Sequence, residues 1–379
     1  MSDPAYPAAR AVAAQIQLHF SRQLVEERER GTHELASVPD DAEIEAMIDA
    51  AFWASLRRQE HYPPKLSLAF LSPEQSGLPL TFERRLSLAP ESLARLAPAV
   101  ERPGIHLGVW RKNGEFYVWG ATRTLPVLCF VVEVMDPGVL VIKHRGSADS
   151  GKFVNVAVLE GDQIKVLDHE SVSLRYAPML VASLLGFEVP AASADSMNVL
   201  VQIAVSMCAH GRGGTLLIVP QGTEGWRESI VGPTAYAISP PYSELAALIR
   251  EAPGERRERR WQEALRRTVD AVAGLTAVDG AMVLTDQCEL LAFGAKIGRR
   301  EGWPRIEQVA ETELVEGAIG RTLHPGQLGG ARHLSAAQFA QDQNDSVALV
   351  ASQDGRFTVL AWSAVKAEVC AYRVEALLL

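Results

Sequence analysis

Apolar residues recur at helical spacing near the N-terminus of the chain. In the segment DDAEIEAMIDAAFWASLRRQE they fall three or four positions apart, which places them on one face of a helix. The apolar positions are Ile44, Met47, Ile48, Ala51, Phe52 and Leu56. Asp40 or Asp41 can cap the start of this helix. The Ala-, Arg- and Glu-rich residues before it predict another helix that ends near Gly31 and is followed by a linker.

Between residues 64 and 170, short apolar runs alternate with turn signals, which predicts a β-rich region. Asn-Gly in RKNGEF lies between two of these runs and indicates a hairpin. His106, Trp110, Tyr117 and Trp119 alternate along this hairpin. We interpret them as one packed face of a sheet, and a ligand platform is the alternative.

Further along, the pattern becomes a mixture of helices and strands. A helix is expected over 176–186, and Pro190 with its small neighbours marks a domain boundary. Helices are expected at 195–210, YSELAALIREA and RERRWQEALRRTVDAVAGL, and strands at GRGGTLLIVPQG, GAMVLTD and ELLAFGAKI. We therefore predict three parts. Residues 1–40 form an N-terminal helix and linker, and residues 41–190 form a β-rich α+β domain. Residues 191–379 form an α/β domain with a mixed central sheet flanked by helices.

Composition and charge narrow the functional classes. The hydrophobic fraction is 47% and the charged fraction is 22%. The formal net charge is -9, and the chain has no long Lys/Arg run. Broad binding to nucleic acids is therefore not expected. The four cysteines are scattered without metal-ligand spacing. The start of the chain lacks a signal-peptide pattern, and no apolar run reaches the roughly 18 residues of a membrane span. These features predict a soluble cytoplasmic protein.

One candidate site lies where Asp279, Gly280 and Ala281 connect a helix to a strand. A carboxylate on such a loop can coordinate a divalent cation or accept a hydrogen bond from a ribose hydroxyl. The glycine lets a ligand approach the backbone closely. An ordinary Asp-Gly turn is the alternative interpretation.

A second candidate site is the segment GGARHLS at 329–335, where two glycines precede a helix. Free N–H groups at a helix start favour a phosphate. Arg332 adds a cation and His333 a second donor, with Ala331 and Ser335 on either side. In the alternative interpretation, Arg332 is simply an exposed residue at the helix start. Neither a GxSxG elbow nor a P-loop occurs in the chain.

Together the two segments resemble the nucleotide-binding domain of the diadenylate cyclase superfamily, which pairs a DGA motif with a downstream RHR motif. The resemblance covers about 205–362. It implies a diadenylate-cyclase-like fold for the C-terminal domain. In that family the DGA aspartate positions a metal and the attacking ribose hydroxyl, and the RHR residues hold phosphates. Two such domains meet face to face, each with one ATP, and form cyclic di-AMP with release of pyrophosphate.

The resemblance assigns roles to individual residues. Asp279 would be catalytic in an active enzyme and would hold Mg²⁺ or Mn²⁺. The nucleotide-binding residues that it implies are Gly280, Ala281, Ile297, Ala331, Arg332, His333, Leu334 and Ser335.

The chain departs from the family pattern at two places. Leu334 occupies the third RHR position, so one phosphate-binding cation is missing, which Lys296 or Arg299 could replace. The family usually ends its next strand with Ser-Glu-Glu, whereas this chain reads Ser352, Gln353 and Asp354. Losing one charged phosphate contact costs roughly 1.5–3 kcal/mol, and phosphoryl transfer depends on such positioning.

These departures are typical of a binding fold with weakened catalysis. The chain resembles the DACNV type, a branch proposed as nucleotide sensors in bacterial signalling. We therefore expect a sensor that binds ATP or a nucleotide second messenger such as cyclic di-AMP. One alternative is an active diadenylate cyclase, a nucleotidyltransferase that works as a face-to-face homodimer. The other is an interaction module with a dead pocket.

Overall fold

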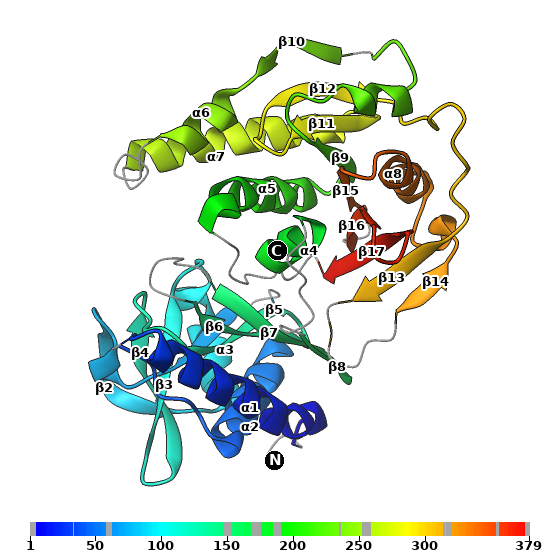
Figure 1. The fold of residues 1–379 in the computed structure, drawn as a ribbon. Coiled ribbons are helices and arrows are strands. Elements are labelled where there is room, and N and C mark those ends of the chain that lie inside the picture. The colour runs from blue at the N-terminus through cyan, green and yellow to red at the C-terminus, as the bar shows by residue number, and fades with distance from the viewer. Residues whose placement is uncertain are drawn as a thin grey trace. The chain divides into compact units, whose positions relative to one another are not determined.

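The computed structural model describes most of the chain. The described residues are 5–32, 34–57, 63–146, 153–167, 176–184, 191–234, 236–251, 259–313, 315, 320–353 and 356–375. The chain divides into two compact units, Met1–Leu167 and Asp168–Leu379 (Figure 1). The boundary predicted at Pro190 lies outside the described residues. Among the helices that the structure describes, none is both long enough and apolar enough to cross a membrane.

The N-terminal unit combines three helices with an eight-stranded sheet of order β2-β4-β3-β1-β5-β6-β7-β8. Its helices are α1 (Pro7–Glu29), α2 (Asp41–Ser55) and α3 (Pro90–Val100). Its strands are β1 (Leu66–Phe70), β2 (Leu80–Ser87), β3 (His106–Lys112), β4 (Glu115–Thr122), β5 (Phe130–Asp136), β6 (Val139–Arg145), β7 (Phe153–Glu160) and β8 (Gln163–Val166). Strands β1 and β3 pair in parallel, and the other pairs are antiparallel.

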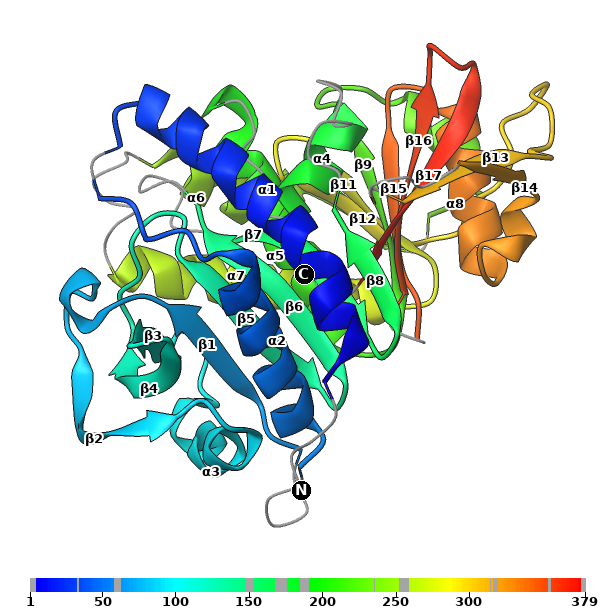
Figure 2. The same cartoon turned by 90° about the horizontal axis from the view of Figure 1, so that it is seen from below.

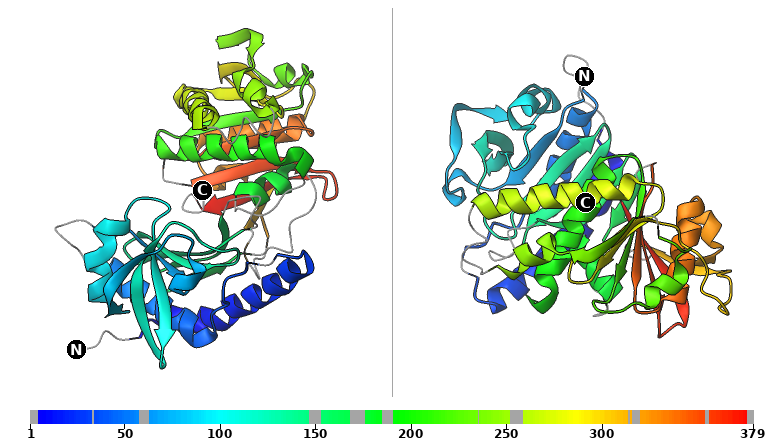
Figure 3. Two further views of the ribbon diagram at one scale, coloured as in Figure 1. Left: turned by 90° about the vertical axis from the view of Figure 1, so that its left-hand side faces the viewer. Right: turned by 90° about the horizontal axis from the view of Figure 1, so that it is seen from above.

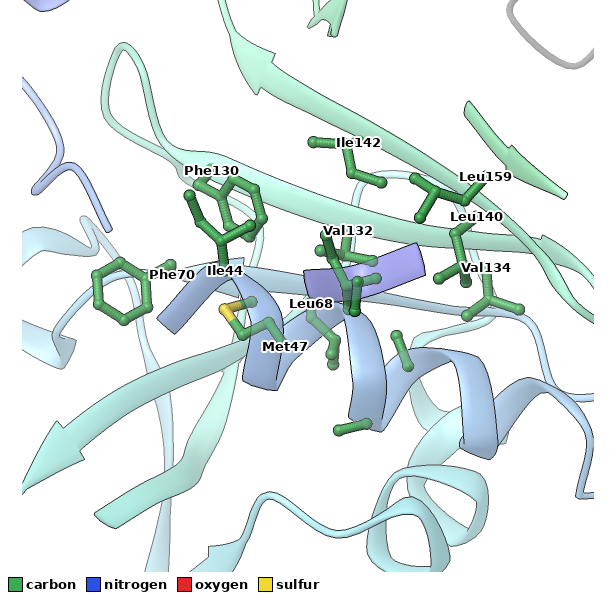
Figure 4. Packing of buried hydrophobic residues seen from close by; sticks show 14 of the residues in the cluster. Ile44, Met47, Leu68, Phe70, Phe130, Val132, Val134, Leu140, Ile142 and Leu159 are labelled. Atoms are coloured by element: carbon green, nitrogen blue, oxygen red, sulfur yellow. The ribbon is translucent and has the colours of Figure 1, made fainter. Parts of the chain in front are cut away.

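The start of α2 confirms the predicted cap. The Asp40 carboxylate accepts a hydrogen bond from the Glu43 backbone N–H at 2.9 Å, and the Asp40 N–H donates to the Glu43 carboxylate at 2.8 Å. This reciprocal capping box satisfies two backbone donors that the first helical turn cannot pair internally. The helix then places Ile44 and Met47, both fully buried, against the sheet (Figure 4). Figure 2 shows α1 and α2 side by side on this sheet, where α2 contacts β5 and β6 and α1 contacts β7 and β8.

The predicted hairpin joins β3 to β4 through Asn113 and Gly114, both of which have positive φ. Trp119 lies on the face of the sheet opposite the helices, and its indole N–H donates to the Leu71 carbonyl at 2.7 Å. The ring covers Gly108, where a Cβ would lie 2.0 Å from Trp119 Cε2. Glycine is therefore required at position 108, because the tryptophan occupies the space of any side chain there.

The C-terminal unit has a nine-stranded sheet of order β10-β12-β11-β9-β15-β16-β17-β13-β14. Its strands are β9 (Gly214–Val219), β10 (Tyr236–Tyr242), β11 (Ala281–Thr285), β12 (Leu290–Ala295), β13 (Val309–Glu313), β14 (Arg321–Leu323), β15 (Val347–Ala351), β16 (Arg356–Ser363) and β17 (Glu368–Glu375). Its α-helices are α4 (Tyr176–Leu184), α5 (Ala191–Ala209), α6 (Glu244–Arg250), α7 (Arg259–Gly274) and α8 (Ala331–Asp342).

Helices cover both faces of this second sheet. Helix α8 contacts β9, β15, β16 and β17, and its Ala336, Phe339 and Ala340 are fully buried in the core on that side. Helices α5 and α7 pack together on the other side, as the right-hand view of Figure 3 shows. The sheet is mixed because β9–β11 and β13–β17 pair in parallel while the other strand pairs are antiparallel.

The structure confirms the mixed α/β class predicted from the sequence, with two large mixed sheets and flanking helices. The hydrophobic pattern did not predict α3, β2, β10, β13, β14 or β17. Strand β10 shows why: most of its residues are exposed, so it lacks the apolar alternation by which strands are recognised. Asp354, which stands where the related family usually has a glutamate, lies outside the described residues.

Candidate functional site

The strand order of the C-terminal unit brings distant segments to one edge of its sheet. Parallel strands β9 and β11 start side by side, with Ala281 opposite Thr215. Strand β12 ends opposite the start of β11, and β15 ends opposite Gly214. The loops at these strand ends therefore lie at the same edge. We call the residues of these loops, together with Arg332, the site edge. It comprises residues 211–213, 278–280, 296–297, 332 and 352–353.

The DGA segment is held in place by the close approach of two backbones. Gly280 has φ +115°, and a Cβ there would lie 2.5 Å from the carbonyl carbon of Gly294. Only glycine fits, because this contact is between backbone atoms that cannot move aside. Ala281 follows with its side chain buried in the core. Asp279, by contrast, projects into solvent with 91% of its side chain exposed.

Two cations act on the Asp279 carboxylate. The Lys296 ammonium, at the end of β12, donates a hydrogen bond to it and forms an ion pair. This hydrogen bond and the Lys296 charge lower the pKa of Asp279 below its ordinary value, and the Arg332 charge acts in the same direction. Asp279 is thus held in its ionised form, and the structure brings it together with Lys296 and Arg332 from three separate segments.

Arg332 lies in the first turn of α8, next to the start of β9. A Cβ built on Gly213, which has φ +68°, would lie 2.8 Å from Arg332 Nη1. The same point is 3.3 Å from Cγ of Gln353, whose amide donates to the Arg212 carbonyl at 3.2 Å. Arg332 itself is exposed, so its guanidinium is available to an anion at the site edge.

The neighbouring His333 points the other way. Only 1% of it is exposed, and its Nε2 lies 3.3 Å from the Thr358 hydroxyl on β16. Its ring covers Gly329, where a Cβ would lie 2.4 Å from the ring Nδ1. The structure therefore separates two adjacent residues of the motif: Arg332 lies at the surface, and His333 lies beneath the helix.

The remaining predicted residues differ in their surroundings. Leu334 and Ile297 are half-buried and pack against the core beneath α8. Ser335 donates a hydrogen bond through its hydroxyl to the Arg332 carbonyl at 3.1 Å, within the same helical turn. Ala331 and Arg299 are exposed. Of the two basic residues expected to replace the missing arginine, Lys296 is the one that contacts Asp279.

The site edge offers few ligands for a metal ion. Among the described residues, no group of three or more His, Cys, Asp or Glu side chains could hold one. Asp279 could contribute one oxygen, and Mg²⁺ is often bound by one or two carboxylates together with substrate phosphates. The residues present therefore fit a cation that arrives with a phosphate-bearing ligand, and they do not form a metal site of their own.

The sequence pattern did not single out Arg212 in the turn that precedes β9. Gly211 and Gly213 both have positive φ, and they place Arg212 beside Gln353. His210 lies next to this turn, and its Nε2 is 3.0 Å from the Thr276 hydroxyl. Two glycines on either side of an arginine were the available signal, because they allow the backbone to turn tightly at a strand start.

In the N-terminal unit, a polar cluster lies on the sheet face that carries Trp119. The Ser67 hydroxyl and His106 Nδ1 are 2.8 Å apart, and the His106 ring lies 5.7 Å from the Phe153 ring. Lys143 lies over Phe153 at 4.5 Å and forms an ion pair with Glu133. Burial, with the charges of Lys143 and Arg145, lowers the pKa of His106 to about 4. His106 is therefore a neutral, packed histidine.

Comparison with known families finds a match for one part of the chain. The family model described as "Probable sensor domain DACNV" matches residues 33–123, all of which belong to the N-terminal unit. No curated protein matches the chain. The chain thus contains a segment similar to a sensor domain, and this segment runs from the residues before α2 to the residue after β4.

Proposed function

We propose that the protein is a nucleotide sensor whose C-terminal unit binds ATP or a nucleotide second messenger such as cyclic di-AMP at the site edge. Arg332 contacts phosphate oxygens at the N-terminal end of α8, where the helix dipole also favours an anion. Asp279 accepts a hydrogen bond from a ribose hydroxyl or holds a Mg²⁺ or Mn²⁺ ion that arrives with the phosphates. Lys296 holds the Asp279 carboxylate and supplies the second cation.

The observation that carries this proposal is the convergence of three exposed charged side chains from separate segments. Asp279 and Lys296 have 91% and 56% of their side chains exposed, and Arg332 is also exposed. An exposed ion pair contributes little to folding. Gly280 lets the Asp279 loop approach the Gly294 backbone, and Gly213 lets Arg332 lie against the start of β9, so both glycines bring the charged segments together. The arrangement is therefore better explained by an anionic ligand than by stability.

The described site edge favours binding over catalysis. Leu334 packs into the core where the related motif carries a third cation, and His333 is turned inward. Phosphoryl transfer depends on several charged groups held around the reacting phosphate. The two cations and one carboxylate of the site edge hold the nucleotide in this proposal without transferring its phosphates. The match of residues 33–123 to a sensor domain is compatible with this role.

Calorimetric titration of the purified chain with ATP and Mg²⁺, and separately with cyclic di-AMP, tests the proposal. We expect Arg332→Ala to weaken binding of the cognate nucleotide by about 10- to 100-fold, because one charge-assisted hydrogen bond contributes roughly 1.5–3 kcal/mol. Arg321→Ala is the matched control, since Arg321 is exposed on β14 at the other end of the sheet order.

Equal affinity in wild type and Arg332→Ala would overturn the assignment of the phosphate site. Chromatography of the nucleotides after long incubation separates a sensor from a synthase. Intact ATP supports the sensor. Cyclic di-AMP that disappears in Asp279→Asn would show instead that the chain is a diadenylate cyclase.

A further inference from the structure

A stacked aromatic pair lies beside the site edge. Tyr236 on β10 and Phe293 on β12 are opposite each other in the ladder, and their rings stack at 4.7 Å with an interplanar angle of 10°. Tyr236 is 51% exposed although it is stacked on Phe293. The pair therefore presents part of an aromatic ring to solvent.

Two contacts connect this ring to the DGA loop. A Cβ built on Gly294, which has φ +63°, would lie 2.8 Å from Tyr236 Cδ2 and 3.5 Å from Val278 Cγ1. The Tyr236 ring and the Val278 side chain thus approach the same point above Gly294. Val278 immediately precedes Asp279, and the Gly294 backbone is also the group that Gly280 touches. Tyr236 is consequently a spatial neighbour of the Asp279 loop.

The surroundings of Tyr236 suit a small planar ligand better than an added strand. Strand β10 is an edge strand, but its Pro240 and Pro241 have no backbone N–H to donate to a partner strand. An exposed aromatic ring beside the Asp279 loop suits a nucleobase, since every base can stack on an aromatic ring.

We infer that Tyr236, supported by Phe293, is the platform on which the base of the bound nucleotide stacks, and that it favours purines over pyrimidines. This inference rests on the proposed nucleotide site and adds its base-binding half. The preference follows from stacking area, because a two-ring purine covers more of the tyrosine than a one-ring pyrimidine. Phe293 fixes the plane of the tyrosine ring.

Binding measurements with separate probes for the two halves of the nucleotide test this inference. Adenosine probes the base, inorganic tripolyphosphate probes the phosphates, and ATP and CTP probe the whole nucleotide. We expect Tyr236→Ala to weaken adenosine and ATP binding by about tenfold or more and to leave tripolyphosphate binding unchanged. Tyr236→Phe should retain the affinity, because stacking needs the ring and not the hydroxyl. Wild type should bind ATP more tightly than CTP.

Tyr242→Ala is the matched control. Tyr242 lies on the same strand and is 37% exposed, but its hydroxyl donates to Glu244. Unchanged ATP and adenosine affinity in Tyr236→Ala, or equal affinity of wild type for ATP and CTP, would overturn the platform. Tripolyphosphate binding that is insensitive to Arg332→Ala would instead overturn the proposed phosphate site. An adenosine affinity that depends on Tyr236 would support the platform even then.

Discussion

Each unit of the protein contains a lysine–carboxylate pair, and the two pairs have different surroundings. In the N-terminal unit, Lys143 and Glu133 have 14% and 29% of their side chains exposed, and Lys143 also lies over Phe153. In the C-terminal unit, Lys296 and Asp279 are 56% and 91% exposed. The first pair is part of a packed sheet face, whereas the second projects from loops at a sheet edge.

The difference shows how residue type and surroundings together indicate function. Charged groups that are covered and contact aromatic rings fix the local packing, and removing one leaves its partner uncompensated. Charged groups at an exposed edge contribute little to folding and remain free to bind a ligand. The same chemical pair therefore has a structural role in the N-terminal unit and, in our proposal, a binding role in the C-terminal unit.

The largest expected effect tests how tightly the sheet face of the N-terminal unit is packed. Gly108→Ala places a methyl group where Trp119 Cε2 would be 2.0 Å away, and the tryptophan is held by its hydrogen bond to Leu71. We expect the free energy of unfolding to fall by about 3 kcal/mol, measured by denaturant titration. Gly274→Ala at the end of α7 is the control, because no atom lies within 4 Å of the added methyl. Similar stability of the two variants would show that the tryptophan can move.

A smaller effect should appear in the pH dependence of stability. The pKa of His106 is lowered to about 4 in the folded protein, mainly by burial. The unfolded chain binds a proton near pH 6.5 while the folded protein does not, so stability falls as the pH drops from about 6.5 towards 4. This one histidine should account for a loss of about 2 kcal/mol between pH 7 and pH 5.

Denaturant titrations of wild type and His106→Asn at several pH values measure this contribution. The variant keeps a polar group beside Ser67 but cannot titrate in this range. Its stability should therefore change less between pH 7 and pH 5 than that of wild type. Parallel pH profiles for the two proteins would mean that His106 is not the neutral, packed histidine described above.

The features that the sequence predicted are the local ones. The helix cap at Asp40 or Asp41 and the Asn113–Gly114 turn depend on residues a few positions apart, and the structure has the cap at Asp40 and the turn at Asn113–Gly114. The position of Arg332 at the start of a helix is also local, and its role in binding stays a prediction. The contact in which Trp119 covers Gly108, by contrast, lies at a shift in register between β3 and β4. The periodicity of the sequence does not reveal this shift.

The orientation of the site residues required the tertiary structure. His333 follows Arg332 directly, yet it faces inward because Thr358 on β16 lies beneath the helix. Lys296 meets Asp279 only because β12 pairs with β11. Tyr236 reaches the same loop from an edge strand with little apolar pattern. Contacts between segments that are distant in sequence decide these three positions.

The smallest expected effect concerns the exposed pair itself. Lys296→Ala should raise the pKa of Asp279 towards its ordinary value, because the hydrogen bond and charge of Lys296 are the main causes of its lowering. Stability at neutral pH should hardly change, since exposed ion pairs contribute little. Carboxyl chemical shifts followed against pH measure the change, and Lys296→Arg should keep the pKa low. A clear loss of stability in Lys296→Ala would contradict the comparison of the two pairs, because the site edge would then be supporting the fold.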